Sequence, residues 1–266
     1  MRLRVVALTV AGPIVLIGCS DNAPDTGATS TAALSGPRVV ASTTWTGAFA
    51  RAAGASDVRV IAPAEFQHPP DYEPRPSDLL ALRDADFVVF GGMERFVDRL
   101  KETAGGGAKV IQVRPDNTRD AIRAEVSRLG GLFGTQRPAE EFLGRFEAVY
   151  NRLAQELRSA GGVGADRPAV ISNVVQAWWA ELAGLKVLAT FPNQPLSAQQ
   201  VADLAARDPD LVFDNANVPG AAAVAQEAGA ERVLLTNFPD RDLDLIALFE
   251  ANAGHIRDAL RKREHR

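Results

Sequence analysis

The sequence predicts an α/β protein of two lobes, each with a four-stranded parallel sheet flanked by helices, joined by a single long rigid helix. Three observations lead to this fold class. Short apolar segments alternate with helical patterns, four such segments occur in each of two sets, and one long amphipathic segment separates the sets. The chain has 266 residues, of which 46% are hydrophobic and 23% charged. This is an ordinary globular composition, and the length suits two small domains.

The N-terminal lobe is predicted to span residues 38–137. Its expected strands are short, apolar and rich in β-branched residues, and they are Val39–Ser42, Val58–Ile61, Phe87–Phe90 and Val110–Val113. Helical patterns lie between them, near Trp45–Ala53, Ser77–Arg83 and Glu94–Thr103. Strands that alternate with helices in this way form parallel sheets.

Residues 138–160 are predicted to form the linking helix. Apolar residues recur at three- and four-residue spacing, Pro138 lies at the start, and Gly161 and Gly162 follow the end. Such a helix is about 35 Å long, the size of a small lobe. Residues 161–266 then repeat the strand pattern as a C-terminal lobe that closes with a helix from Leu243 to about Lys262. The expected strands are Ala169–Ser172, Val187–Phe191, Leu211–Phe213 and Val233–Leu235.

The first residues have the pattern of an export signal. Arg2 and Arg4 precede an apolar run, and the run ends in Leu-Ile-Gly-Cys at Cys19. We expect residues 1–18 to be a signal peptide of the bacterial lipoprotein type, with Cys19 as the lipidated residue that anchors the protein to the cell membrane. Residues 19–37 contain almost no large apolar side chain, so a flexible tether is expected there.

Composition and motifs argue against several functions. The chain has 29 basic and 33 acidic residues, so it lacks the basic surface that nucleic-acid binding requires. One cysteine and three histidines cannot form a disulfide framework, a zinc finger or an iron–sulfur cluster. No nucleophile elbow, P-loop, HExxH motif or dinucleotide-binding glycine pattern is present. We therefore do not expect an enzyme. The protein is also expected to be a monomer.

Two segments of the predicted first lobe resemble a known family. The segments Gln67–Leu79 (QHPPDYEPRPSDL) and Ala85–Glu94 (ADFVVFGGME) look like the first-lobe signature of the zinc/manganese-binding lipoproteins of bacterial ABC importers. These are the ZnuA/TroA-like, cluster A-I solute-binding proteins. The resemblance implies two lobes joined by a rigid helix, a divalent metal (manganese or zinc) held between them as cargo, and an ABC permease as partner.

The same resemblance implies a set of metal ligands, which this sequence matches only in part. The family has a His directly before its acidic-aromatic-Glu-Pro motif, where this chain has Pro70, with His68 two residues earlier. The family's second His is replaced by the segment Arg114–Asn117, in which Asp116 is the only acidic residue. The candidate ligands are therefore His68, Asn173, Asp214, Asn237 and Asp240. One imidazole and several oxygens suit manganese better than zinc, although Asn and Asp after strands are also common turn formers.

Two alternatives remain open from the sequence. Aromatic residues in or beside the predicted rim loops could form the wall of a site for an organic solute or a metal chelate, or they could simply pack in the lobes. They are Trp45, Phe66, Tyr72 and Trp178. The missing ligands also fit a surface-anchored accessory or interaction protein that has lost metal binding. Such a protein would not gain thermal stability from any metal or solute.

Overall fold

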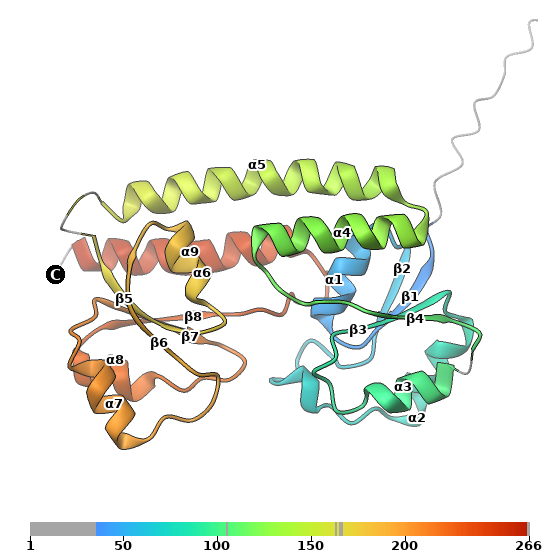
Figure 1. The fold of residues 1–266 in the computed structure, drawn as a ribbon, viewed down its shortest axis with the longest axis horizontal. Coiled ribbons are helices and arrows are strands. Elements are labelled where there is room, and N and C mark those ends of the chain that lie inside the picture. Colours follow the sequence, from blue (N-terminus) through green and yellow to red (C-terminus); the bar gives the residue numbers. More distant parts are fainter. Residues whose placement is uncertain (1–35, 105, 163, 165–166, 265–266) are drawn as a thin grey trace, which may run out of the picture. The chain divides into compact units, whose positions relative to one another are not determined.

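The computed structural model describes residues 36–104, 106–162, 164 and 167–264. The predicted signal peptide, Cys19 and nearly all of the tether lie outside these residues. Residues 34–266 form one compact unit. Two lobes lie under a long helix within this unit (Figure 1). None of the helices in the described ranges is long and apolar enough to cross a membrane.

The first lobe is built around an all-parallel sheet with strand order β2-β1-β3-β4. The strands are β1 (Arg38–Ala41), β2 (Asp57–Val60), β3 (Phe87–Phe90) and β4 (Lys109–Gln112). The helices are α1 (Thr44–Ala52), α2 (Pro76–Leu80), α3 (Val97–Ala104) and α4 (Arg119–Phe133), with 3₁₀ turns at Pro69–Asp71 and Ala81–Asp84. The central strands β1 and β3 are mostly apolar and buried, as expected for a sheet covered on both faces.

The second lobe repeats this arrangement with strand order β6-β5-β7-β8, again all parallel. The strands are β5 (Ala169–Asn173), β6 (Lys186–Phe191), β7 (Leu211–Asn215) and β8 (Glu231–Leu235). The helices are α6 (Ala177–Leu182), α7 (Ala198–Ala205), α8 (Ala222–Ala228) and α9 (Leu245–Glu264). The helix α5 (Gln136–Ala160) runs between the lobes, so the predicted fold class is confirmed.

Each predicted strand matches an observed one within one or two residues, whereas some helices differ. The helix predicted near Ser77 is a short α-helix followed by a 3₁₀ turn. The helix predicted from Glu94 begins at Val97, because Glu94 accepts hydrogen bonds from the preceding loop. The helix α4 was not predicted. Its buried apolar side chains Ile122, Val126 and Leu129 do have helical spacing.

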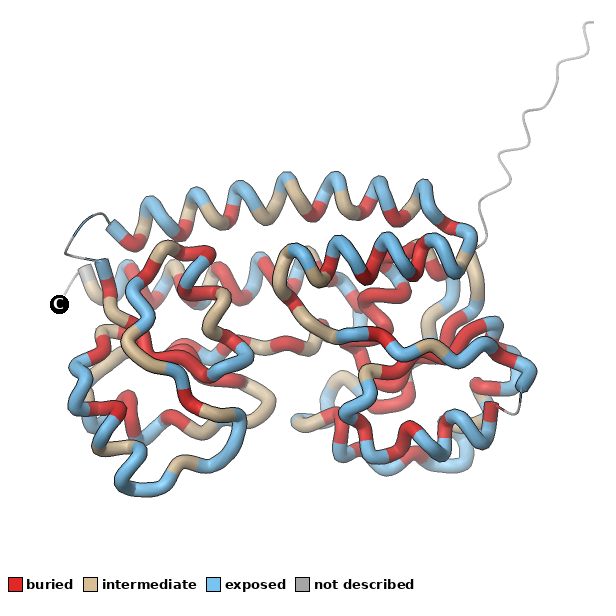
Figure 2. Tube along the Cα trace, viewed as in Figure 1, coloured by how far each residue is buried: buried red, intermediate tan, exposed pale blue. Residues whose placement is uncertain are grey.

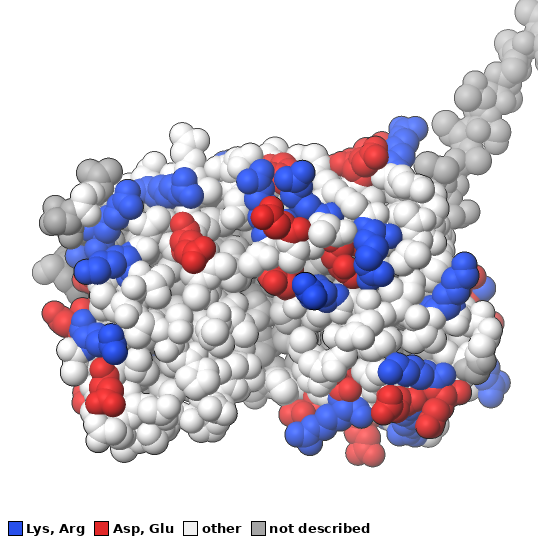
Figure 3. Space-filling view, in the orientation of Figure 1, with Lys and Arg blue, Asp and Glu red and all other residues white. Residues whose placement is uncertain are grey.

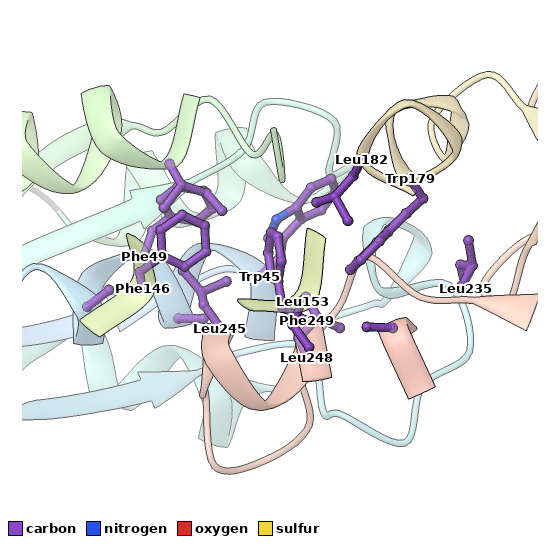
Figure 4. Close-up of a cluster of buried hydrophobic side chains, with 14 of the residues drawn as sticks. Trp45, Phe49, Phe146, Leu153, Trp179, Leu182, Leu235, Leu245, Leu248 and Phe249 are labelled. Atoms are coloured by element: carbon purple, nitrogen blue, oxygen red, sulfur yellow. The ribbon is translucent and has the colours of Figure 1, made fainter. Parts of the chain in front are cut away.

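A continuous hydrophobic core joins the two lobes. The helix α5 packs against α1 and α4 of the first lobe and against α6 and α9 of the second. Phe49, Phe146, Trp179 and Phe249 are almost fully buried in this core, and the rings of Phe146 and Phe249 meet edge to face at 5.1 Å (Figure 4). The buried stripes of α5 and α9 follow their apolar positions (Figure 2). This shared core fixes the two sheets relative to each other, because separating the lobes would expose these aromatic side chains.

The loops that follow the strands of one lobe contact those of the other. Asn217 Nδ2, after β7, donates a hydrogen bond of 3.1 Å to the backbone oxygen of Gln67, after β2. Beside this contact Arg241 forms an ion pair with Glu65. The carboxyl ends of both sheets therefore border one interlobe region, which is where open α/β sheets bind ligands.

Candidate functional site

The first-lobe wall of the site contains an imidazole–carboxylate pair. His68 caps the 3₁₀ turn Pro69–Asp71, and its Nδ1 lies 2.8 Å from Asp71 Oδ2. The other Asp71 oxygen lies 3.1 Å from Arg95 Nε. The hydrogen bond from His68 is the main cause that lowers the pKa of Asp71 below its ordinary value, with smaller contributions from the charges of His68 and Arg95. The imidazole thus lies beside the contact between Gln67 and Asn217 but is paired within its own loop.

Glu94 is the most buried carboxylate of the first-lobe rim, and it holds loops together. Its oxygens accept hydrogen bonds from the backbone N–H groups of Gly91, at 2.9 Å, and Gly92, at 2.8 Å. The hydroxyl of Ser42, after β1, donates to the same carboxylate. Gly92 has φ = 89°, a left-handed conformation that favours glycine. Glu94 therefore ties the end of β1 to the end of β3, and its acceptor sites are occupied.

The second-lobe wall is lined by asparagines. Asn173 and Asn215 end β5 and β7, and their Nδ2 atoms lie 3.3 Å and 2.8 Å from Oδ1 of Asn193. Asn217 continues the network: its backbone N–H donates a hydrogen bond of 3.0 Å to Asn215 Oδ1, and its own Oδ1 accepts one from the Thr236 hydroxyl. Of this network the sequence pointed only to Asn173. Asn193, Asn215 and Asn217 could have been found as amides two to four residues after predicted strands of a parallel sheet.

Asn237, after β8, faces the first lobe. Its backbone oxygen accepts a hydrogen bond of 3.2 Å from Asn117 Nδ2, and its Oδ1 lies 3.5 Å from the same nitrogen. Asn117 is itself positioned by Trp45, whose indole N–H donates to Asn117 Oδ1 at 2.7 Å. Both asparagines are buried. The lobes therefore meet here through neutral amides, and Asn117 is a further site residue that sequence reasoning did not select.

The two second-lobe carboxylates among the candidate ligands do not join His68. Asp214 is fully buried and forms an ion pair with Arg232, with Nη2 at 2.7 Å. Its oxygens also accept hydrogen bonds from the backbone N–H groups of Gly220 and Ala221. Asp240 is exposed and accepts a hydrogen bond from the backbone of Asp242 within its own turn. Asp214 thus holds the loop after β7, and Asp240 shapes the turn before α9.

An interlobe pocket of about 400 Å³ lies next to the Asn117–Asn237 contact. Trp45 and Trp178 line it, together with Val174 and Val175 from the loop after β5, which are 54% and 38% exposed. Arg114 and Asp116 supply its charged groups; both follow β4. The other two aromatic candidates lie in the loop after β2, where the buried Tyr72 donates to Asp78 and the half-exposed Phe66 packs against Tyr72.

These side chains do not fit a bare divalent cation in the usual way. Across the described residues, no group of three or more His, Cys, Asp or Glu side chains is placed to hold a metal ion. Charged side chains cluster over α4, α5 and the first lobe on the face seen in Figure 3, and few lie over the lower part of the second lobe. The groups near His68 are one imidazole, one carboxylate that is already paired with Arg95, and neutral amides. They would leave much of the charge of a divalent cation uncompensated.

Part of the chain matches a known family. Residues 39–128 match the sequence model of the family described as ZnuA, zinc-uptake complex component A, periplasmic. This stretch covers most of the first lobe and contains His68, Asp71 and Glu94. No curated protein sequence matches the chain.

Several solved structures have the same fold at low sequence identity. The solute-binding protein FpvC of Pseudomonas aeruginosa, solved with Ni²⁺, is 19% identical with a TM-score of 0.64, and the match covers 85% of this chain and 96% of that one. The laminin-binding protein Lmb of Streptococcus agalactiae, described as an adhesin with metal-transporting activity, is 19% identical with a TM-score of 0.64 over 85% and 100% of the two chains. A zinc-bound deletion mutant of ZnuA is 21% identical with a TM-score of 0.61 over 84% and 97%.

At these identities the solved structures establish only the fold. The family match adds a similarity in sequence, which is confined to residues 39–128 of the first lobe. The resemblance predicted from the sequence is thereby confirmed: over residues 39–128 the chain matches the zinc-uptake family, and over most of its length it has the fold of metal-bound solute-binding proteins.

Proposed function

We propose that this protein is a non-enzymatic, extracytoplasmic solute-binding protein that captures a divalent metal between its lobes and delivers it to an ABC importer. The observation that carries the proposal is the meeting of strand-end loops from two parallel sheets beside His68, within the stretch that matches the zinc-uptake family. The metal-bound structures with the same fold support metal as cargo. Manganese, zinc and nickel are the ions to test first.

His68 is the proposed metal ligand of the first-lobe wall. Its Nδ1 is occupied by Asp71, which leaves Nε2 as the atom that would bind the metal. A carboxylate that accepts a hydrogen bond from the other ring nitrogen orients the imidazole and makes it a better ligand. We assign Asp71 this orienting role. Asn173 and Asn237 are proposed as neutral oxygen donors of the opposite wall, Asp240 remains a candidate ligand at its exposed edge, and Asp214 is proposed to position the loop after β7.

The proposal is tested by equilibrium dialysis against growth medium that contains manganese, zinc and nickel, followed by elemental analysis of the protein. The medium presents each metal both as the free ion and as complexes with its organic components. We expect about one metal ion per chain for the wild type. His68→Ala should lose most of this metal. His255→Ala is the matched control, because His255 lies on α9 with its Nδ1 against the backbone oxygen of Leu234. This variant should retain the metal.

Absence of bound metal from the wild type in every dialysis would contradict the proposed function and favour an accessory or interaction role. Equal loss of metal from His68→Ala and His255→Ala would instead show that neither imidazole is a specific ligand. Thermal unfolding of both variants without metal checks that they are folded.

The cellular setting belongs to the same proposal. We propose that residues 1–18 are removed, that Cys19 carries the lipid anchor, and that residues 19–37 tether a monomeric two-lobed body of residues 38–266 to the membrane. An ABC permease is the proposed partner. Cys19→Ala should move the protein from the membrane fraction to the soluble extracytoplasmic fraction, whereas an unchanged membrane fraction would contradict lipidation at Cys19.

A further inference from the structure

We propose that the metal arrives as a small anionic carboxylate chelate, and that the pocket beside Asn117 and Asn237 binds this chelate with one of its carboxylates on Arg114. The inference rests on the proposed metal-uptake function and specifies the chemical form of the cargo. It follows from the charges of the site, from the side chains that line the pocket, and from the pocket's size.

Few acidic groups of the interlobe region remain to balance a bare dication: Glu94 accepts hydrogen bonds from Ser42, Gly91 and Gly92, and the acidic groups beside His68 and in the pocket are accompanied by arginines. On the first-lobe wall Asp71 is paired with Arg95, and the pocket contains one carboxylate, Asp116, and one guanidinium, Arg114. The second-lobe wall offers amides from Asn173, Asn215 and Asn237. Burying an uncompensated double charge is costly. A metal that brings its own carboxylate ligands removes this cost, since the complex as a whole is neutral or negative.

Arg114 is available to receive such a complex. It directly precedes Pro115 in the loop after β4, and within the described part of the chain no ion pair or hydrogen bond involves its guanidinium group. Its backbone N–H lies 3.4 Å from Glu125 Oε1, which fixes the loop at this point. Guanidinium groups bind carboxylates through paired, charge-assisted hydrogen bonds. A guanidinium without a partner at this pocket would repel a bare metal ion, whereas it would attract an anionic chelate.

The rest of the pocket suits an organic body more than a hydrated ion. Val174 and Val175 expose apolar surface to it, and Trp45 and Trp178 contribute ring faces or edges. Trp178 is held in place by stacking on the buried Trp179, with ring centroids 4.3 Å apart. A volume of about 400 Å³ falls in the range of small-molecule sites and far exceeds the space that a bare ion needs. Asn117 and Asn237 also line the pocket.

Isothermal titration calorimetry of the purified full-length protein tests the inference. The titrants are NiCl₂ alone, each of two carboxylate chelators alone (citrate and nitrilotriacetate), and the one-to-one nickel complexes of the two, which carry a net negative charge. We expect at least one nickel complex to bind roughly tenfold or more tightly than both NiCl₂ and its own chelator. Arg114→Gln should weaken that complex roughly tenfold or more, the size expected for a lost charge-assisted hydrogen bond. Arg83→Gln, an exposed arginine of the 3₁₀ turn Ala81–Asp84, is the matched control and should bind like the wild type.

Four results would overturn the inference. NiCl₂ binding as tightly as every complex would show that bare metal is the cargo, and the proposed function would stand. Unchanged affinity in Arg114→Gln would remove the guanidinium from the site. Failure of both complexes to bind would also contradict the inference. So would equally tight binding of a chelator without metal, which would indicate an organic solute. The dialysis experiment on metal content then decides the proposed function separately. Unaltered thermal unfolding of Arg114→Gln without ligand shows that the variant is folded.

Discussion

The two walls of the interlobe region differ in charge although they are built on the same sheet topology. The first-lobe wall carries ionisable groups, with His68, Asp71 and Arg95 in one loop and Arg114 in another. The second-lobe wall ends its strands in asparagines, and its buried carboxylate Asp214 is held by Arg232 and by backbone N–H groups. The loops at equivalent positions of the two sheets therefore differ in chemistry. The first-lobe wall carries charged groups, and the second-lobe wall carries neutral hydrogen-bonding groups.

Removing the Asp214 carboxylate should lower the free energy of unfolding more than any other proposed substitution. Such a loss would show that the buried charge of the second-lobe wall stabilises the fold. Asp214→Ala leaves Arg232 without its partner and the loop at Gly220 and Ala221 without its acceptor. We expect the free energy of unfolding to fall by about 3 kcal/mol, as for other buried ion pairs that lose one member. Urea unfolding measures this.

Asp240→Ala serves as the matched control, because Asp240 is an exposed carboxylate of the same lobe. Its unfolding free energy should change by less than about 0.5 kcal/mol. Normal stability of Asp214→Ala together with loss of metal would instead make Asp214 a ligand.

Adding a negative charge to the second-lobe wall should reduce the difference in charge between the two walls. Asn237→Asp places a carboxylate of nearly the same shape at the interlobe contact, where it can still accept from Asn117 Nδ2. Because an added negative charge within a few ångströms attracts a dication by several kcal/mol at protein-like dielectric, we expect bare Mn²⁺ to bind on the order of 100-fold more tightly. Calorimetry with MnCl₂ measures the change.

Asn151→Asp, at an exposed position of α5, controls for the overall charge and should leave Mn²⁺ affinity unchanged. Equal gains in both variants would mean that net charge, and not the site, attracts the ion.

The link between the walls can be weakened at Trp45. Trp45→Phe removes the N–H that donates to Asn117 Oδ1 and so loosens the contact between Asn117 and Asn237. We expect a loss of about 1 kcal/mol in the free energy of unfolding, the usual contribution of one hydrogen bond. Trp178→Phe is the comparison, since none of the described residues accepts a hydrogen bond from its indole N–H. A stability loss in Trp178→Phe as large as in Trp45→Phe would attribute the effect to ring size.

The smallest expected effect is on the pKa of Asp71 in the first-lobe wall. Asp71 has a lowered pKa, chiefly because of its hydrogen bond with His68, so its ionised form favours the folded state above its unfolded pKa, near 3.8. This contribution is lost as the pH falls through the lower folded-state pKa. In His68→Ala the pKa of Asp71 should rise towards its ordinary value, which NMR titration of the carboxyl carbon follows. An unchanged pKa would assign the shift to Arg95.

Much of the fold could be read from the sequence because it depends on local patterns. Apolar runs such as Phe87–Phe90 and Leu211–Phe213 mark buried strands, and the spacing from Phe142 to Leu157 marks the stripe of α5 that packs on both lobes. The helix α4 was not predicted, although its buried side chains Ile122, Val126 and Leu129 follow the helical period.

The candidate site was harder to predict because its chemistry depends on partners distant in sequence. Asp214 follows a strand, as a ligand would, but its pairing with Arg232 depends on β7 and β8 lying side by side. Asn117 was not selected as a site residue from the sequence, yet it contacts Asn237, which lies 120 positions later in the chain. A single residue's type indicates what it can donate or accept, whereas only its neighbours decide whether that capacity is already used.

The amino-acid sequence by itself determined the two parallel sheets, the helix between them and the places where their strands end, because burial periodicity and chain punctuation are local properties. The tertiary structure alone decided which of the polar groups at those ends are free. Hydrogen bonds and ion pairs between distant segments satisfy Glu94 and Asp214, and they leave the guanidinium of Arg114 at the pocket.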